Sequence, residues 1–357
     1  MATKDFFRDL IKDMPDTTLA SDGEAGSEFK GYIDTNCYLL NAAFSGSLFG
    51  GMPNNKVLTL AGESATGKTF FALALVDSFL KQHPDGGCVY FDTENAITND
   101  MLTGRNMDLK RIIKSEPTTV EEYRTRAVQM LDRYMAQEPK ARRPLIMVTD
   151  SLGGLTSEKE KKDISEGNNV RDMTRAQVLR GTFRVLRPKL AQAGVAMIVT
   201  NHVYDVVGAY VPTKKMGGGA GLQYTSDTIA FLSKKKDKDS DNQIVGNIIH
   251  IKMEKSRLSR ENTKVDVKLS YTRGLSKYYG LLEMAEEAGL VEKVGNKYKF
   301  PSGEAFFAKK VYAEPETFFT PDFLKRLDDE YVAKNFRYMT LEDEAVADGS
   351  PDDDGDE

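Results

Sequence analysis

The clearest chemistry in the sequence lies in a glycine-rich segment near residue 65. Residues Gly62–Thr69 read Gly-Glu-Ser-Ala-Thr-Gly-Lys-Thr and separate the apolar run Val57–Leu60 from the apolar segment Phe70–Val76. A strand, a glycine-rich turn and a helix in this order are what a phosphate-binding loop requires. Its glycines let the backbone curl, so that consecutive N–H groups and the helix N-terminus face one phosphate. We therefore expect this loop to bind a nucleotide.

The end of the loop and a distant aspartate supply groups that a nucleoside triphosphate needs. Lys68 adds a positive charge for the β- and γ-phosphates, and the Thr69 hydroxyl is a ligand for Mg²⁺. Asp150 ends an apolar run, where a phosphate-loop fold places the acid that holds Mg²⁺ through water. We expect ATP and Mg²⁺ as cofactors, with Thr69 and Asp150 as the metal-site residues. The predicted nucleotide-binding residues are Gly62, Glu63, Ser64, Ala65, Thr66, Gly67, Lys68, Thr69 and Asp150.

Further polar residues follow other apolar runs. Glu94 lies two residues beyond the run Cys88–Asp92, from where a carboxylate can orient and deprotonate the water that attacks the γ-phosphate. An exposed loop acid is the alternative. His202 follows another such run, where it can touch the γ-phosphate on one side and the next segment on the other. Lys255 and Arg257 follow a third run and can complete a neighbouring subunit's nucleotide site, as an arginine finger does, unless they are simple surface charges.

These residues need a scaffold that brings them together. Apolar runs predict strands at residues 57–60, 88–92, 144–150, 195–200 and 228–232. Helical spacing separates them, notably over Val120–Met135 and Ala176–Leu190. Continuous apolar strands that alternate with helices form a mostly parallel sheet buried on both faces, with ligands at the carboxyl ends of the strands. The predicted fold class is α/β.

Two segments have compositions that suit DNA. Val203–Tyr224 is too long for a plain turn, and its basic, glycine-rich centre Lys214–Leu222 lets another backbone approach closely. Tyr204, Val207, Tyr210 and Val211 can stack on bases or wedge between them. A second loop, Ser157–Asn169, leads into an arginine-rich helix, whose basic side is either a solvated face or a phosphate track. The arginines are Arg171, Arg175, Arg180, Arg184 and Arg187.

Length and charge bound the organisation of the chain. Its 357 residues, 40% of them apolar, suffice for one large core and a smaller lobe. The net charge is −5, but residues 341–357 hold nine acidic and no basic residues, which leaves 45 acidic against 49 basic residues, a charge of +4, in the remainder. Such a tail is usually a disordered solvating segment; the sharper hypothesis is a tethered polyanion that competes with DNA.

The composition also argues against membrane and secreted classes. No run approaches the ~18 apolar residues that a membrane span needs, and no signal peptide is visible. Cys37 and Cys88 stand in apolar contexts without metal-ligand spacing, which predicts buried, reduced thiols in a cytoplasmic protein.

Residues 4–14 have the pattern of an amphipathic helix, which the polar link Ser21–Ser27 joins to the rest of the chain. This helix docks on a neighbouring subunit or on its own domain; the pattern does not separate the two.

Together these motifs resemble the RecA family of recombinases, most closely the UvsX-type recombinases of bacteriophages. The similarity runs from about Asp34 to Phe300. It rests on Gly62–Thr69, Tyr90–Ile97, Ile146–Gly153, Met173–Arg187, Thr200–His202, Met216–Leu222, Lys255–Arg257 and Tyr279–Glu283. The resemblance implies an ATP-dependent helical filament on single-stranded DNA. Such a filament pairs that strand with a homologous duplex, exchanges strands, and hydrolyses ATP under stimulation by DNA.

The resemblance also implies roles for single residues. Glu94 matches the family's water-activating glutamate, His202 its γ-phosphate sensor, and Lys255 with Arg257 the pair that reaches the neighbour's ATP. With Lys68 these form the expected catalytic set. The family's two DNA-binding loops imply DNA contacts at Arg175, Val207, Tyr210, Gly218 and Gly219. Met101 stands where an adenine-stacking Tyr is common in the family, and Tyr271 is better placed for adenine.

The expected organisation follows from the same comparison. It comprises an N-terminal helix and linker for oligomerisation (1–33), a RecA-like ATPase core (34–278), a small α+β carboxyl-terminal lobe (279–340) and the acidic tail (341–357). The lobe's lysines are available for duplex DNA, although scattered lysines are equally what a soluble lobe displays. Expected partners are single-stranded DNA, double-stranded DNA, further copies of the chain, a single-strand-binding protein and a loading mediator. The alternative functions are a hexameric helicase with a RecA fold, or a nucleotide-gated recombination mediator without strand exchange.

Overall fold

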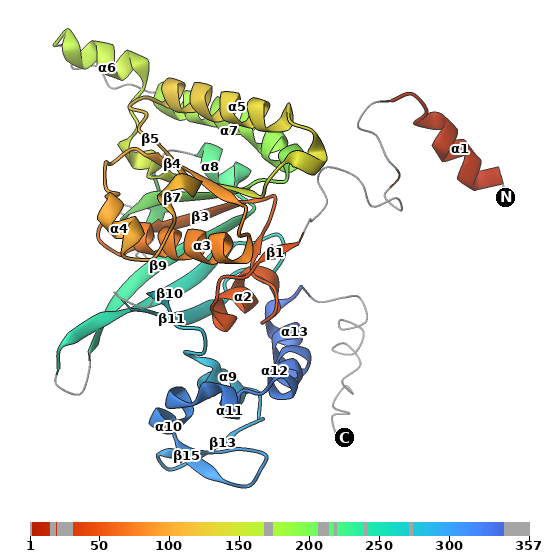
Figure 1. Cartoon of the computed structure of the whole chain (residues 1–357), viewed down its shortest axis with the longest axis vertical. Coiled ribbons are helices and arrows are strands. Elements are labelled where there is room, and N and C mark those ends of the chain that lie inside the picture. The colour runs from red at the N-terminus through yellow and green to blue at the C-terminus, as the bar shows by residue number, and fades with distance from the viewer. Residues whose placement is uncertain are drawn as a thin grey trace, which may run out of the picture. The chain divides into compact units, whose positions relative to one another are not determined.

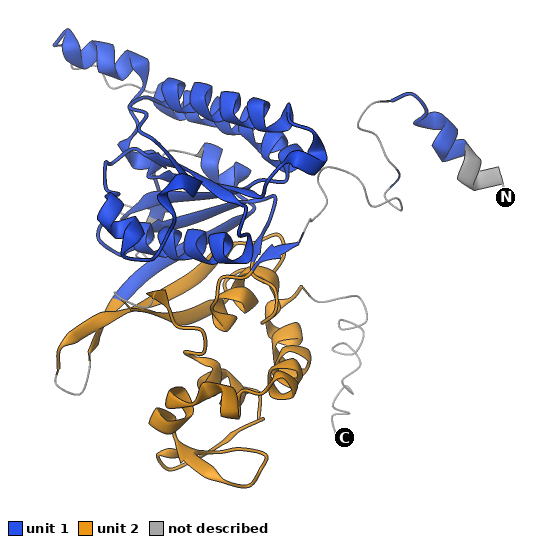
Figure 2. Ribbon diagram, in the orientation of Figure 1, with its two compact units in different colours: residues 1–33, 52–234 blue, residues 34–51, 235–357 orange. Residues whose placement is uncertain are grey.

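The computed structural model describes most of the chain in two compact units. Unit 1 comprises Met1–Ile33 and Met52–Lys234, and unit 2 comprises Asp34–Gly51 and Lys235–Glu357 (Figure 2). The residues described are 2–14, 19, 31–167, 174–205, 214–217, 220–238, 242–270 and 274–338. The following predictions lie outside them: the DNA contacts at Val207, Tyr210, Val211, Gly218 and Gly219, the arginine Arg171, the adenine contact at Tyr271, the link Ser21–Ser27, and the tail 341–357.

Unit 1 is built on a parallel sheet. Its strands run in the order β9-β3-β7-β6-β4-β5, and each neighbouring pair is parallel. A short strand, β8, pairs with β7 in the antiparallel direction. The bounds are β3 (Val57–Gly62), β4 (Gly87–Asp92), β5 (Ile112–Ser115), β6 (Leu145–Asp150), β7 (Ala196–Asp205), β8 (Lys214–Met216) and β9 (Thr228–Lys238), whose last residues belong to unit 2. The predicted mostly parallel α/β sheet is confirmed.

Helices cover both faces of this sheet (Figure 1). Helices α5 and α7 pack side by side on one face, where their buried residues meet alternate strand residues such as Val89, Met147 and Val199. The intervening residues of the strands face the other side, where α3 packs. The helices of unit 1 are α1 (Ala2–Leu10), α3 (Lys68–Gln82), α4 (Asn99–Thr103), α5 (Val120–Met135), α6 (Glu158–Ser165), α7 (Thr174–Ala193) and α8 (Ala220–Thr225). A small antiparallel pair, β1 (Tyr32–Ile33) and β2 (Met52–Pro53), completes the unit.

Unit 2 joins an antiparallel ladder to a small α+β lobe. The ladder is β10 (Ile244–Lys255), β11 (Lys264–Ser270) and β12 (Gly274–Leu275). The lobe has a three-stranded sheet of β13 (Glu292–Val294), β14 (Lys297–Lys299) and β15 (Ala305–Phe307). Helices of the unit are α2 (Tyr38–Ser45), α9 (Leu281–Glu287), α10 (Ala308–Ala313), α11 (Pro315–Phe318), α12 (Pro321–Leu327), a π-helical turn (Asp328–Val332) and α13 (Ala333–Phe336).

A buried aspartate fastens the first segment of unit 2 to its last helices. Asp328 accepts hydrogen bonds from the backbone N–H of Leu48 at 2.6 Å and from the Ser47 hydroxyl at 2.9 Å. Arg337 donates to the Gly46 carbonyl at 2.7 Å. Because these partners are about 280 residues apart in sequence, the carboxylate closes a long loop and holds α2 within the unit.

Three segments differ from the sequence predictions. Helix α6 occupies most of the predicted loop Ser157–Asn169, because the Ser157 hydroxyl caps it by accepting from Glu160 N at 3.0 Å. Strand β7 continues past residue 200 to Asp205, since β8 pairs with it there. Strand β10 ends at Lys255, so Arg257 lies in the bend beyond it.

Cys37 and Cys88 are free and buried, as predicted. In the described part of the chain no helix has the length and apolar character that crossing a membrane requires.

Candidate functional site

The glycine-rich loop joins β3 to α3 with a backbone that few residues tolerate. Ala65 and Gly67 have φ of 59° and 95°, and Gly67 is the N-cap of α3. A Cβ on Gly62 would lie 2.8 Å from the Leu232 carbonyl oxygen of β9, so a side chain does not fit there. The loop therefore curls over the helix N-terminus, where N–H groups and the helix dipole favour an anion. This is the geometry predicted for a phosphate-binding loop.

Lys68 is held over this loop. Its Nζ donates to the carbonyls of Gly62 at 3.0 Å and Glu63 at 2.8 Å, and the residue is only 7% exposed. Burial lowers the pKa of Lys68, and the negative charges of Glu94 and Asp150 oppose that shift. The ammonium group therefore stands close to the loop amides, where a phosphate would meet it.

Asp150 ends β6 and is almost fully buried. Its Oδ2 accepts from the Tyr90 hydroxyl at 2.9 Å, and its Oδ1 accepts from the Thr200 hydroxyl. Burial, together with the Asp150 charge, raises the pKa of Tyr90 well above its usual range, so Tyr90 remains a donor. Because both carboxylate oxygens already have donors, Asp150 suits contact with Mg²⁺ through water, whereas Thr69 at the start of α3 offers a hydroxyl directly.

These oxygen donors fit Mg²⁺, which usually takes one or two protein ligands and completes its shell with waters and nucleotide phosphates. Within the described ranges, no group of three or more His, Cys, Asp or Glu side chains is close enough to hold a metal ion.

Glu94 and His202 meet at the carboxyl edge of the sheet, although 108 residues separate them in sequence. His202 Nε2 lies 3.2 Å from Glu94 Oε1, and the Ser151 hydroxyl donates to the same oxygen. Partial burial raises the pKa of Glu94, but the Ser151 and His202 contacts and the Lys68 charge outweigh it, so this pKa lies below its ordinary value. Glu94 is therefore an ionised carboxylate at neutral pH, as a general base requires.

Strand β7 connects His202 with Gly217, at the described part of the predicted DNA segment Val203–Tyr224. Asn201 Nδ2 donates to the Gly217 carbonyl at 2.7 Å, and Gly217 N donates to the His202 carbonyl at 2.9 Å. The β7–β8 ladder pairs Val203 with Met216 and Tyr204 with Lys215. The backbone of His202 is thus hydrogen-bonded directly to that of Gly217.

Arg175, predicted to contact DNA, lies at the start of α7. Its guanidinium donates to the carbonyls of Leu155 at 2.6 Å and Leu152 at 2.7 Å. It therefore fastens the segment after β6 to α7, and its DNA contact stays a prediction.

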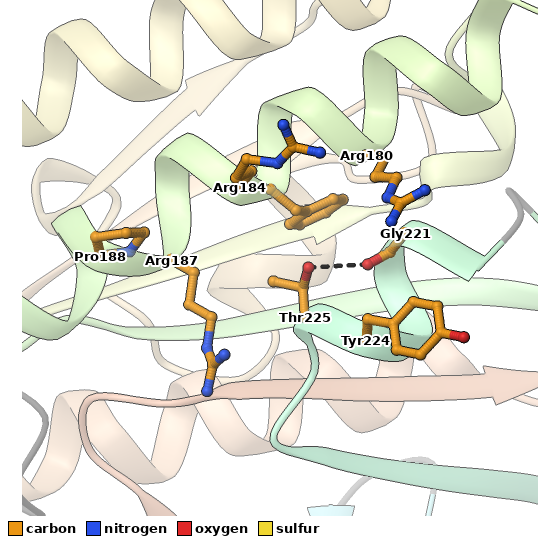
Figure 3. Close-up of a pocket in the computed structure, with 8 residues that line it drawn as sticks. Arg180, Arg184, Arg187, Pro188, Gly221, Tyr224 and Thr225 are labelled. Carbon is orange, nitrogen blue, oxygen red and sulfur yellow. Dashed lines mark hydrogen bonds between the residues drawn. The ribbon is translucent and has the colours of Figure 1, made fainter.

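Further along α7, Arg180, Arg184 and Arg187 line a groove against α8 (Figure 3). The groove has a volume of about 320 Å³ and is completed by Phe183, Pro188, Gly221, Tyr224 and Thr225. Arg187 pairs with the buried Asp227 at 3.0 Å. Arg180 and Arg184 are exposed and have no such ion pair within the described residues, and the exposed ring of Tyr224 lies at the edge of α8. Two cations beside an aromatic ring suit a phosphate and a base.

Two residues of the site escaped the sequence analysis. Ser151 directly follows Asp150, but only the pairing of β4 with β6 shows that its hydroxyl reaches Glu94. Lys234 donates to the Ala65 carbonyl in the phosphate loop. Gly62, the last residue of β3, pairs with Leu232 of β9, so Lys234 lies two residues further along β9, beside the loop that follows β3. Only the pairing of β3 with β9 would have revealed this contact.

Lys255 and Arg257 belong to unit 2. Lys255 is half-buried at the end of β10, and Arg257 is exposed in the following bend. Their predicted role at a neighbour's nucleotide stays a prediction.

Comparison with known proteins identifies the family. Residues 22–276, more than two thirds of the chain, match the model of the RecA N-terminal domain. The "Recombination and repair protein" of Enterobacteria phage T4 is 34% identical over 267 residues, which span 75% of this chain and 66% of that protein. Protein RecA of Paracoccus denitrificans is 25% identical over 288 residues, or 77% of this chain and 76% of the relative. Protein RecA of Lactobacillus acidophilus is 24% identical over 302 residues, or 84% and 78%. With its phosphate loop, its parallel sheet and these matches, the chain belongs to the RecA family of recombination proteins.

Proposed function

We propose that the chain is a DNA-dependent ATPase that assembles on single-stranded DNA, pairs it with a homologous duplex and exchanges strands. The observation that carries this proposal is the contact of Glu94 with His202, since His202 lies on β7 and its backbone is hydrogen-bonded to Gly217. One strand thus links the centre of hydrolysis to the segment proposed to hold DNA. The names of the phage and bacterial relatives support the same function.

Hydrolysis follows from the chemistry of the site residues. The loop amides and Lys68 bind the phosphates, and Thr69 and Asp150 would hold Mg²⁺, which would neutralise negative charge during phosphoryl transfer. Glu94 orients the water and takes its proton while the water oxygen bonds to the γ-phosphorus. The bond from this phosphorus to the bridging oxygen breaks, and ADP leaves with the electron pair. His202, beside Glu94, senses whether the γ-phosphate is present.

DNA stimulation follows from the connection between β7 and β8. DNA bound at the segment that includes Gly217 acts on His202 and Glu94 through the hydrogen bonds from Asn201 and Gly217. The groove that holds Arg180, Arg184 and Tyr224 provides further contacts for the backbone and bases of one strand.

Filament formation needs a surface on each copy that fits the next. Helix α1 exposes Phe6 at 61%, Phe7 at 48% and Leu10 at 57%, an apolar face that suits docking on a neighbouring copy. Lys255 and Arg257 of one copy reach the nucleotide of the next, in the manner of an arginine finger. A heterologous interface of this kind propagates into a helix when its rotation does not close a ring.

The small lobe of unit 2 offers cations for duplex DNA. Lys293, Lys297 and Lys310 lie over the rings of Tyr298, Phe307 and Phe306, with Nζ 4.9 to 5.5 Å from the ring centroids. The rings support the lysine stems, so the charges stand on one small sheet and its following helix. Sequence-independent attraction to phosphates is the role that such a surface suits.

The test is ATP hydrolysis by the purified chain with and without single-stranded DNA, with Glu94→Gln beside it. We expect strong stimulation by DNA and a loss of about 100-fold or more in the variant, the range typical of a general base. Glu138→Gln, which removes an exposed acid on the same unit, serves as the matched control and keeps the wild-type rate. Formation of joint molecules between homologous DNAs is the second assay.

Other outcomes identify the alternative functions. Hydrolysis that ignores DNA, or a Glu94→Gln protein that retains its biological function, favours a nucleotide-gated mediator. Branch migration without any pairing of homologous DNA favours a helicase.

A further inference from the structure

The carboxyl ends of β4 and β6 are joined beyond their last paired residues. The parallel register ends at Asp92↔Asp150, but Thr93 N then donates to the Asp150 carbonyl at 2.9 Å, and the Thr93 hydroxyl donates to the Ser151 carbonyl. A Cβ on Gly154 would lie 2.6 Å from the Thr93 hydroxyl oxygen, so the two segments are in close contact. The loop that carries Glu94 therefore starts from a fixed position relative to Ser151.

The base of this loop is held on its other side as well. The buried carboxylate of Asp92 accepts from the backbone N–H groups of Ala96 at 2.9 Å and Ile97 at 3.0 Å. Lys114 of β5 lies 3.3 Å from the same carboxylate and also donates to the Ile97 carbonyl at 2.9 Å. Hydrogen bonds thus hold both ends of the short loop that carries Glu94.

The side chain of Glu94 is 39% exposed and has several rotatable bonds, so without a partner it would populate several rotamers. The hydroxyl of Ser151 comes from a residue that is only 1% exposed, and it donates to Glu94 Oε1. His202, whose side chain is 25% exposed, approaches the same oxygen. Among the described residues, the hydrogen bonds to Glu94 from side chains all reach Oε1, which leaves Oε2 for a water molecule.

We propose that Ser151 is a positioning residue for hydrolysis: its buried hydroxyl holds Oε1 of Glu94 so that Oε2 receives the proton of the attacking water. This inference rests on the proposed function, because it assumes that Glu94 is the general base. Ser151 suits the role because its backbone is fastened to the residue that follows β4, Thr93, whereas His202 lies on β7, which is hydrogen-bonded to Gly217 of the proposed DNA segment. The serine provides the fixed contact and the histidine the variable one.

The substitution that tests this is Ser151→Ala, which removes one oxygen atom from a buried position. We expect kcat with saturating single-stranded DNA to fall about 10- to 100-fold, the loss typical of a misplaced catalytic group, while KM for ATP changes less than about twofold. Ser78→Ala is the matched control, since Ser78 is also buried but lies in the last turns of α3, where its hydroxyl contacts Gln82. The control should keep the wild-type kcat.

A double-substitution cycle separates positioning from a general structural effect. Single-turnover hydrolysis with protein in excess over ATP gives rates for Glu94→Gln with and without Ser151→Ala. If Ser151 acts only through the Glu94 carboxylate, it has little effect once that carboxylate is gone, so the two rates should agree within about twofold.

Three results would overturn the inference. The first is an unchanged kcat in Ser151→Ala, and the second is a raised KM for ATP without a fall in kcat. The third is a rate loss from Ser151→Ala that is as large in the Glu94→Gln protein as in the wild type. The proposed function would fail through a different result, namely a Glu94→Gln protein that hydrolyses ATP at the wild-type rate. The two failures are therefore distinguishable.

Discussion

Gly153 lies directly against His202: a Cβ built on Gly153 would stand 2.9 Å from Cδ2 of the imidazole and 3.2 Å from the Ser151 hydroxyl oxygen. The absence of a side chain at this position allows the imidazole to reach Glu94. Since real Cβ atoms do not approach other atoms so closely, an alanine here would displace His202 or the short turn that carries Gly153.

We therefore predict that Gly153→Ala lowers kcat for ATP by about 10-fold or more, because it separates His202 from Glu94. Overpacking should also cost about 1 to 3 kcal/mol in the free energy of unfolding. Gly181→Ala is the control: an added Cβ in the middle of α7 meets nothing within 4 Å. It should stabilise the protein by about 0.5 to 1 kcal/mol. Steady-state kinetics and thermal unfolding measure both effects, and a fully active Gly153→Ala protein would refute the first.

The pH dependence of hydrolysis should depend on Ser151. Burial raises the pKa of Glu94, while Ser151, His202 and Lys68 together lower it below the ordinary value. The general base must be ionised, so kcat falls as the pH drops through this pKa. Removing the Ser151 hydroxyl takes away a donor that favours the carboxylate and leaves the effect of burial, so the pKa rises. Activity should then be lost at a higher pH than in the wild type.

A pH–rate profile of kcat at constant ionic strength checks this for wild type, Ser151→Ala and Ser78→Ala. The Ser78→Ala profile should coincide with that of the wild type. A Ser151→Ala profile that coincides with it, or loses activity only at lower pH, contradicts the expectation.

Lys234 should contribute to nucleotide affinity rather than to chemistry. Its Nζ donates to the carbonyl of Ala65, a residue with φ of 59°, so it stabilises an uncommon backbone conformation and adds positive charge beside the phosphates. Lys234→Met keeps the aliphatic stem and removes the donor. We predict a three- to tenfold weaker affinity for ATP, about 0.6 to 1.4 kcal/mol, with kcat nearly unchanged.

The control for this prediction is Lys235→Met, because neighbouring residues of β9 point to opposite faces. Titration with a fluorescent ATP analogue measures both variants. Equal affinities for the two proteins would show that the contact with Ala65 has no role in binding.

The sequence was sufficient for the parts of the fold that depend on local patterns. Helix α5 has the predicted bounds Val120–Met135, and the predicted strands before the phosphate loop and before Asp150 are present. Each combines a strong apolar period with clear end signals, such as the Thr119 cap of α5. A local turn signal, Gly295-Asn296, likewise lies between the paired strands β13 and β14.

What escaped prediction has either a weak local pattern or a basis in pairing between distant residues. Helix α6 is polar and short, so its apolar period is weak, although Ser157 followed by Glu160 is a capping signal. The contact of Ser151 with Glu94 spans 57 residues and that of Lys234 with Ala65 spans 169. Both follow from strand register, which a single sequence does not specify across long crossovers.

The proposal that Lys255 and Arg257 act on a neighbouring copy has a direct test in mixed assemblies. Lys68→Ala removes the phosphate-loop cation and Arg257→Ala removes the cation proposed to reach the neighbour, so neither protein hydrolyses ATP alone. At a heterologous interface, an Arg257→Ala copy supplies an intact loop and a Lys68→Ala copy an intact arginine. In a random equal mixture about one interface in four has this arrangement, so we expect up to about a quarter of the wild-type rate.

The matched control is a mixture of Lys68→Ala with Glu94→Gln. Both substitutions lie in the same nucleotide site of unit 1, so each mixed interface takes its loop and its glutamate from one copy, and that copy is defective in one of them. This mixture should recover nothing, while the Arg257→Ala mixture recovers activity. Co-assembly on DNA is confirmed in both by cross-linking of labelled copies. If neither mixture recovers activity at any ratio although the copies co-assemble, Arg257 acts within its own chain or not at all.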